Sequence, residues 1–252
     1  MRLIRFRVAD RIATGFIDGQ TVRTLKGTFF QEPIPSGDEI PVDDVRLLAP
    51  VIPSKVVGVA RNYPAHAEEL GNPLPAEPMV FFKPATAVIG PGDPIHLPPG
   101  AGRVDHEAEL AVVIGRLCHR VGEDEAEKYV LGYTCANDVT ARDWQRSDGQ
   151  WARAKGSDSF CPLGPWVESE VDASDLEITS TVNGEPRQSG RTSQMVFPPA
   201  ALIAYVSRTI TLLPGDVLLT GTPPGVGPLA RGARVTVQVE RIGVLENTVE
   251  GE

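Results

Sequence analysis

The stretch RVDHEAELAVVIGR, residues 103–116, places three acids at alternate positions directly before an apolar run that is typical of a buried strand. Side chains two residues apart on a strand project from the same face, so Glu107 and Glu109 should lie side by side, with Asp105 at the strand's entrance. Carboxylates held this close raise each other's pKa unless a cation compensates. The acid-bearing face turns apolar directly after Glu109, which indicates the mouth of a cleft.

A third acid, Asp138, ends the next strand-like stretch, within LGYTCANDVTARDWQ. Three carboxylates offer the oxygen ligands of a hard divalent ion, Mg²⁺ with Mn²⁺ or Ca²⁺ as substitutes, and leave positions open for water or substrate. A solvated edge face is the alternative interpretation of Glu107 and Glu109 taken alone.

Composition excludes several classes of protein. The 252 residues are 41% hydrophobic and carry a formal net charge of −9, without a Lys/Arg run, which argues against a nucleic-acid partner. Every apolar run stops short of the roughly 20 residues of a membrane span, and the N-terminus lacks the apolar stretch of a signal peptide. We therefore expect a folded, soluble, cytoplasmic protein with no membrane partner.

The cysteines Cys118, Cys135 and Cys161 form no CxxC pair and have no His partners at zinc spacing. They are expected to be thiols in a reducing compartment.

The pattern along the chain predicts a β-rich protein in two unequal parts. Residues 1–50 should form a small N-terminal β element and a connector, with strands in 3–8 and 11–17 and a polar tract at 31–44. Residues 51–252 should form the main domain. Strands are expected there in 77–84, 107–115, 128–137, 215–221 and 233–243, a type I′ hairpin at Asn183-Gly184, and one helix in 198–210.

A second constellation lies in VGVARNYPAHAEELGNPLPAEP. Pro64 can begin a short helix and Gly71 can end it, which places His66 and Glu69 on one helical face. A carboxylate bonded to a histidine orients the ring and raises its basicity, as a general base requires. The short helix between Pro and Gly loops is also typical of a mobile lid, although such a pair can equally be an exposed surface pair.

A third group follows Asp138. Arg142 and Gln145 are predicted to share a helical face, and Lys155 to stand in a Gly/Ser-bearing loop where its ammonium could meet an anionic substrate. Surface solvation is the alternative. The Gly-rich LLTGTPPGVGP, residues 218–228, lacks the GK[ST] ending of a phosphate loop and could offer backbone amides near a substrate or form a tight turn.

These segments, in their order, resemble the fumarylacetoacetate hydrolase family, in particular its short, stand-alone members. The resemblance covers about residues 54–230 and rests on GVARNYPAHAEE, PMVFFKPATAVIGPGDPI, DHEAELAVVIG, ANDVTARDWQ, QWARAKGSDSFCPLGP, VNGEPRQSGRTSQMVF and LLTGTPPGVG.

The resemblance implies a mixed α/β, β-rich fold with a rolled mixed β-sheet core and assembly as a homodimer. It implies that Glu107, Glu109 and Asp138 bind Mg²⁺ or a related ion, and that the lid residues His66 and Glu69 activate water or move a proton. It further implies that Arg142, Gln145, Lys155 and Thr222 contact substrate, with Lys155 also catalytic and Asp105 in a supporting role.

The activity implied is hydrolysis of a C–C bond in a 2,4-dioxo acid of the acylpyruvate or fumarylpyruvate type, through a metal-chelated enolate. Alternatives are isomerisation of 2-hydroxyhepta-2,4-diene-1,7-dioate or decarboxylation or tautomerisation of a 2-oxo acid such as oxaloacetate, in aromatic catabolism, and a non-catalytic metal-stabilised binding protein. The chain reads RAKGSD where the family often reads RGKSFD, with Ala154, Gly156 and Ser157 in place of Gly, Ser and Phe. Loss of the Phe puts the substrate preference in doubt and leaves metal binding unaffected.

Overall fold

The structure, a computed structural model, describes residues 1–31 and 34–251. Residues 32 and 33, within the polar tract expected as a connector, lie outside the described residues.

The largest sheet has twelve strands, with a main path in the order β4-β3-β2-β1-β14-β12-β11-β17-β6-β7, β5 beside β1 and β8 beside β14. Its strands are β1 (Arg2–Val8), β2 (Arg11–Asp18), β3 (Thr21–Lys26), β4 (Ile34–Pro41), β5 (Arg46–Leu47), β6 (Val56–Ala60), β7 (Met79–Lys83), β8 (Val88–Ile89), β11 (Ala108–Ile114), β12 (Val130–Asn137), β14 (Cys161–Glu168) and β17 (Val217–Leu219). Antiparallel pairs dominate, while β17 and β6 pair in parallel, so the sheet is mixed.

Two smaller sheets complete the strands. A five-stranded sheet has the order β16-β15-β19-β20-β9, and a three-stranded sheet the order β13-β10-β18. Their strands are β9 (Ile95–Leu97), β10 (Val104–His106), β13 (Thr140–Ala141), β15 (Glu177–Val182), β16 (Glu185–Arg191), β18 (Gly227–Pro228), β19 (Arg234–Val239) and β20 (Gly243–Gly251). The expected mixed α/β, β-rich fold is confirmed.

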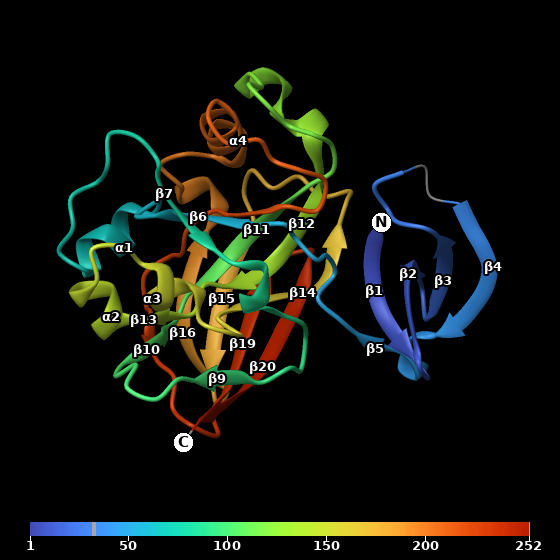
Figure 1. Cartoon of the computed structure of the whole chain (residues 1–252), viewed down its shortest axis with the longest axis horizontal. Helices are drawn as coiled ribbons and strands as arrows, with labels where there is room; N and C mark the ends of the chain where they lie inside the picture. The colour runs from blue at the N-terminus through green and yellow to red at the C-terminus, as the bar shows by residue number, and fades with distance from the viewer. Residues whose placement is uncertain (32–33, 252) are drawn as a thin grey trace.

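The helices are few and short. They are α1 (Pro64–Glu69), α2 (Arg142–Ser147), α3 (Ala152–Gly156) and α4 (Pro199–Ser207), with the 3-10 helices η1 (Val42–Asp44), η2 (Ala85–Ala87), η3 (Glu123–Tyr129) and η4 (Thr192–Gln194). The helices α1, α2 and α3 gather at one flank of the molecule, opposite the N-terminal strands β1 to β4 (Figure 1). Among the described residues, no helix combines the length and the apolar character needed to cross a membrane.

Strand β11 passes through the centre of the molecule and is buried on both faces. Leu110, Val112 and Ile114 pack in a core with side chains of α4 and the five-stranded sheet, whereas Ala111 and Val113 face a second core on the other side. Each fully buried Leu, Val or Ile contributes about 1.5–3 kcal/mol to folding. The apolar run of the opening stretch therefore anchors the acidic residues at its start to the buried interior of the fold.

Local sequence signals explain several elements. The Asn183-Gly184 turn between β15 and β16 has φ values of 54° and 81°, as a type I′ turn requires, which confirms the predicted hairpin. The helix α1 begins at Pro64 and is followed by Gly71 at φ 66°, and α4 lies within the predicted segment 198–210.

Two local expectations were wrong. The tract 31–44 was expected as a connector, yet it contains β4, which pairs with β3 at the edge of the large sheet, a position where strands tolerate proline. Lys155 was expected in a loop, but it lies in α3, because Lys155 N–H bonds back to the Trp151 carbonyl at 2.9 Å and continues a helical turn.

The N-terminal strands continue the large sheet. β1 pairs with β14 through Arg2 opposite Glu168 and Leu3 opposite Val167, so residues 1–50 contact the main part of the chain through a short strand pairing.

Candidate metal and substrate site

Three acidic side chains lie close together where β11 begins and β12 ends. Ala108 pairs with Asn137 across these antiparallel strands, which places Glu107 opposite Asp138, and the Asp138 N–H donates to the Glu107 carbonyl at 2.8 Å. Oxygen atoms of Glu107, Glu109 and Asp138 lie within 4.8 Å of one another, and all three residues are buried. The structure thus brings together the three predicted metal ligands.

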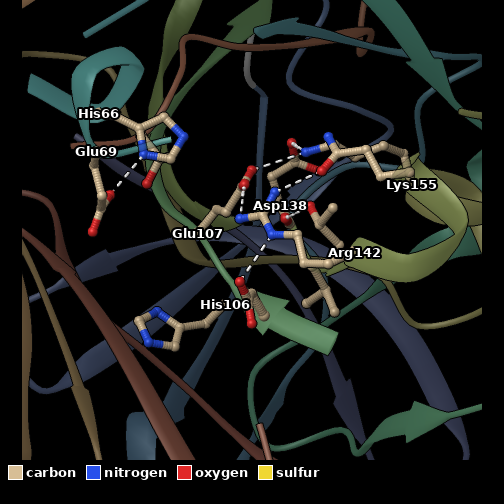
Figure 2. Close-up of polar contacts among 12 residues, drawn as sticks. His66, Glu69, His106, Glu107, Asp138, Arg142 and Lys155 are labelled. Atoms are coloured by element: carbon tan, nitrogen blue, oxygen red, sulfur yellow. Dashed lines mark hydrogen bonds and ion pairs between the residues drawn. The ribbon is translucent and has the colours of Figure 1, made fainter. Parts of the chain in front are cut away.

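Buried cations surround Glu107 and Asp138 (Figure 2). The Lys155 Nζ donates to Glu107 at 2.9 Å and to Asp138 at 2.5 Å, and the Arg142 Nη2 donates to Glu107 at 2.5 Å. Burial alone would raise the pKa of Glu107, but the charges of Lys155 and Arg142 outweigh burial and hold this pKa below its ordinary value. Burial likewise would lower the pKa of Lys155, but Asp138 and Glu107 reverse this effect and raise it. The Glu107 carboxylate and the Lys155 ammonium therefore remain charged.

Glu109 has a different environment. It accepts one hydrogen bond, from the Gly221 N–H at 2.6 Å, and it forms no ion pair with a described residue. Burial raises the pKa of Glu109 well above its ordinary value, and the charges of Asp138 and Glu107 raise it further. This carboxyl lacks a positive partner of its own.

The chemistry of this cluster fits a divalent ion. Four buried carboxylates, of Asp105, Glu107, Glu109 and Asp138, face three buried cations, of Lys83, Arg142 and Lys155. The hydroxyl of Tyr63 is also buried without a hydrogen-bond partner among the described residues, and burial, followed by the Glu109 charge, raises the pKa of this phenol. An all-oxygen donor set with uncompensated negative charge is suited to Mg²⁺, Mn²⁺ or Ca²⁺.

The predicted lid pair is formed by α1. His66 Nδ1 lies 3.1 Å from Glu69 Oε2, and Glu69 Oε1 accepts the Gly225 N–H at 3.0 Å. Because a carboxylate can only accept, Nδ1 carries a proton, which leaves Nε2 as the ring atom available to act as a base. Glu69 thus connects α1 to the loop of residues 220–226.

The third predicted group lies across the acids from the lid (Figure 2). Arg142 Nε donates to Asp105 at 2.8 Å, and Arg142 Nη1 donates to Gln145 at 2.9 Å within α2. Asp105 also pairs with Arg103 at 2.7 Å. Asp105 therefore orients Arg142.

One cavity of about 340 Å³ joins these groups. All predicted site residues except Glu69 line it, and Phe81 and Trp151 supply apolar wall, with ring centroids 5.8 Å apart. Ala154, Gly156 and Ser157, the departures from the usual family pattern, do not line it. The cavity combines an acidic cluster, an imidazole and cations in one space, as a small anionic substrate would require.

Sequence reasoning missed Lys83. This residue ends β7 and is fully buried, and its Nζ donates to Asp138 at 2.5 Å and to the Val139 carbonyl at 3.2 Å. A lone lysine at the end of the apolar run MVFF was the available signal, since a buried lysine requires a partner.

Two family models match the chain. The model described as fumarylacetoacetate (FAA) hydrolase, C-terminal, covers residues 55–250, and the model described as Rv2993c-like, N-terminal, covers residues 1–50.

Similar proteins extend over most of the chain. "Protein Rv2993c" of Mycobacterium tuberculosis is 48% identical over 99% of this chain and 98% of its own length. "Oxaloacetate tautomerase FAHD2A, mitochondrial" of Homo sapiens is 47% identical over 83% of this chain and 71% of its own length. A crystal structure of 5-carboxymethyl-2-hydroxymuconate delta-isomerase from Mycobacterium smegmatis matches at 48% identity and TM-score 0.95, covering 100% of both chains. That of maleylpyruvate hydrolase from Sphingobium sp. SYK-6, in complex with manganese (II) ion and pyruvate, matches at 30% identity and TM-score 0.83, covering 100% of this chain and 99% of that one.

Proposed function

Since this chain belongs to the fumarylacetoacetate hydrolase family, we propose that it is a divalent-metal-dependent enzyme that hydrolyses a C–C bond in a 2,4-dioxo acid of the acylpyruvate type. The observation that carries the proposal is the buried triad of Glu107, Glu109 and Asp138, which shares one cavity with His66 and Lys155. A related maleylpyruvate hydrolase with manganese and pyruvate bound supports this choice of reaction and ligand class.

The triad would hold Mg²⁺, with Mn²⁺ or Ca²⁺ as substitutes. When bound, the ion would supply Lewis-acid polarisation of a carbonyl oxygen next to the substrate carboxylate.

The cations fix the substrate. Lys155 presents an ammonium that stays charged, and Arg142, held by Asp105, presents a guanidinium beside Gln145. Together they neutralise the carboxylate of the substrate and orient its chain toward His66. Phe81, whose ring lies 4.8 Å from Lys155 Nζ, restricts water at this end of the cavity.

His66 acts on water. Its Nε2 accepts a proton from a water molecule whose oxygen attacks the carbonyl carbon remote from the substrate carboxylate, while Glu69 holds the ring by Nδ1. The C–C bond between this carbon and the central carbon breaks. Its electron pair leaves with the three-carbon fragment, which takes up a proton and becomes pyruvate, and the other product is a carboxylic acid.

A second candidate reaction uses the same residues, but no water molecule attacks the substrate. The relatives at 47% and 48% identity are an oxaloacetate tautomerase and a hydroxymuconate isomerase by name, which favours proton transfer on a 2-oxo or 2-hydroxy acid. In that reaction His66 would move a proton between carbon and oxygen of the substrate, and no bond between carbons would break.

Two variants test the assigned roles. Glu107→Gln should abolish both Mn²⁺ binding, measured by calorimetry, and acetylpyruvate hydrolysis, because it removes a ligand charge. His66→Ala should abolish hydrolysis and keep the Mn²⁺ affinity. Glu125→Gln, at an exposed ion pair with Lys128, serves as the control and should change neither. Equal loss of Mn²⁺ affinity in the Glu107 and His66 variants would contradict these roles.

A further inference from the structure

The motif VNGEPRQSG, residues 182–190, has no part in the reaction described above. It forms the turn and second strand of the β15–β16 hairpin and places Gln188 in the interior, where this residue is 2% exposed. The Gln188 amide lies between β11, the Ser180 hydroxyl and the loop of residues 220–226.

The orientation of this amide is determined by its partners. The Ala108 N–H can only donate, and it lies 2.9 Å from one end of the amide, which must be the oxygen Oε1. The Pro223 carbonyl can only accept, and it lies 2.7 Å from the other end, which must be the nitrogen Nε2. His106 Nδ1, 3.0 Å from Oε1, must then donate.

The same reasoning fixes the hydroxyl of Thr222. Gln188 Nε2 donates to Thr222 Oγ1 at 2.7 Å, so the Thr222 hydroxyl hydrogen must go to its remaining partner, the Ala108 carbonyl at 2.8 Å. A hydroxyl has one hydrogen and two lone pairs. Only one lone pair of Thr222 Oγ1 therefore remains, and toward a further partner this group can accept a hydrogen bond but not donate one.

Thr222 lines the cavity with His66 and the acidic triad. We propose that Gln188 is a positioning residue that fixes Thr222 as a hydrogen-bond acceptor, so that the site selects a substrate presenting a hydroxyl, the enol form of a 2-oxo acid, which returns to the keto form before the C–C bond breaks. This inference rests on the proposed function, because it assumes that 2-oxo acids bind in this cavity.

A matched pair of ligands tests the inference. Lactate and pyruvate differ at the second carbon, where lactate carries a hydroxyl and pyruvate a carbonyl that cannot donate. Their affinities for the Mn²⁺-loaded full chain are measured by calorimetry, using the lactate enantiomer that binds more tightly. Thr222→Val should lower the ratio of lactate to pyruvate affinity about tenfold, the effect of one lost hydrogen bond. Thr222→Ser should keep the ratio, because serine retains the hydroxyl.

Gln188→Met retains the length of the side chain and removes the amide. It should lower the same ratio by a similar factor, and Gln188→Met combined with Thr222→Val should lower it no further than Thr222→Val alone. Thr220→Val is the matched control, because Thr220 Oγ1 also donates to a strand carbonyl, that of Leu110 at 2.8 Å, but Thr220 does not line the cavity. It should leave the ratio unchanged.

Three results would overturn the inference: a ratio that Thr222→Val does not change, a Gln188→Met variant that weakens both ligands equally, or additive effects in the double variant. If Gln188→Met does not fold, Thr222→Val and Thr222→Ser still decide the acceptor role. A ratio that responds as expected in a protein without hydrolytic turnover would sustain the acceptor role and reject the proposed reaction. Hydrolytic turnover together with a lactate-to-pyruvate ratio that the variants do not change would support the proposed reaction and reject the acceptor role of Thr222.

Discussion

Glu107 and Glu109 lie two residues apart at the start of one strand, yet the pKa of Glu107 is shifted down and that of Glu109 is shifted up. Both carboxyls are buried, so burial raises both pKa values, and the difference arises from charge. Lys155 and Arg142 pair with Glu107, whereas Glu109 faces the negative charges of Asp138 and Glu107. A divalent ion at the triad would supply the positive charge that Glu109 lacks.

Glu109→Gln should therefore affect stability in opposite directions with and without metal. In EDTA, removal of the buried, repelled carboxyl should raise Tm by about 2–4 °C, the shift that about 1 kcal/mol causes in a chain of this size. In excess Mn²⁺ the wild type should be the more stable protein, because only it retains all three ligands. Scanning calorimetry in both conditions measures this reversal. A lower Tm for the variant in EDTA would contradict the account.

Lys83→Met should lower the free energy of unfolding by about 3–5 kcal/mol, because it leaves Asp138 with one of its two buried cations. Lys128→Met is the control, since it breaks an exposed pair with Glu125 at 2.7 Å and should leave the free energy of unfolding nearly unchanged. Urea unfolding measures both values. Equal costs in the two variants would show that Lys83 does not hold Asp138 as described.

Asp216 should make stability depend on pH. This buried carboxylate accepts the N–H groups of Ser54, Lys55 and Leu213 and pairs with the Lys55 ammonium. Burial opposes its ionisation, but the hydrogen bonds from Lys55 and Ser54 outweigh burial and lower its pKa. A folded-state pKa below the unfolded value of about 3.9 gives stability that is complete above about pH 4 and is lost as pH falls through the folded-state pKa.

Asp216→Asn should accordingly cost about 2–4 kcal/mol at pH 6, and this difference from the wild type should shrink below pH 4. Urea unfolding at pH 6, 4 and 3 provides the measurement. If the difference in free energy of unfolding between wild type and variant stays constant over this pH range, the ionised Asp216 carboxylate does not contribute to stability.

Glu69→Gln should lower kcat about 10- to 100-fold with little change in KM, because the His66 Nδ1–H and the Gly225 N–H bond to two different oxygens of Glu69, and an amide replaces one of these oxygens by a donor. Steady-state kinetics on acetylpyruvate test this split. A change in KM alone would indicate that Glu69 contacts substrate and does not orient His66.

Much of the metal cluster could be predicted from sequence because its signals are local. The alternation of Glu107 and Glu109, and the position of Asp138 at the end of the next strand, depend only on strand geometry and on the pairing of two successive strands. The hairpin at Asn183-Gly184 and the helix at Pro64 carry equally local signals. Each of these elements is specified by residues within its own segment, so it can be predicted without knowledge of distant contacts.

The remaining parts depend on contacts between distant segments. Lys83 reaches Asp138 across 55 positions of the chain, through a sheet order that no local pattern specifies. Gln188 bonds to Ala108 and Thr222, which lie 80 and 34 positions away along the chain, from a hairpin strand whose register shifts between Ser180 and Thr181. The helix α3 has no side-chain cap, so no local signal marks its start, and Lys155 was therefore expected in a loop.

The measurement that tests the central claim most directly is product identification by NMR after incubation with acetylpyruvate, fumarylpyruvate, oxaloacetate and a hydroxymuconate-type diacid, each with Mg²⁺ and with EDTA. We expect Mg²⁺-dependent formation of pyruvate and a free carboxylic acid from at least one of the two acylpyruvates. A Mg²⁺-dependent shift of a double bond or loss of CO₂, without this cleavage, would contradict it and would require that water activation by His66 be abandoned.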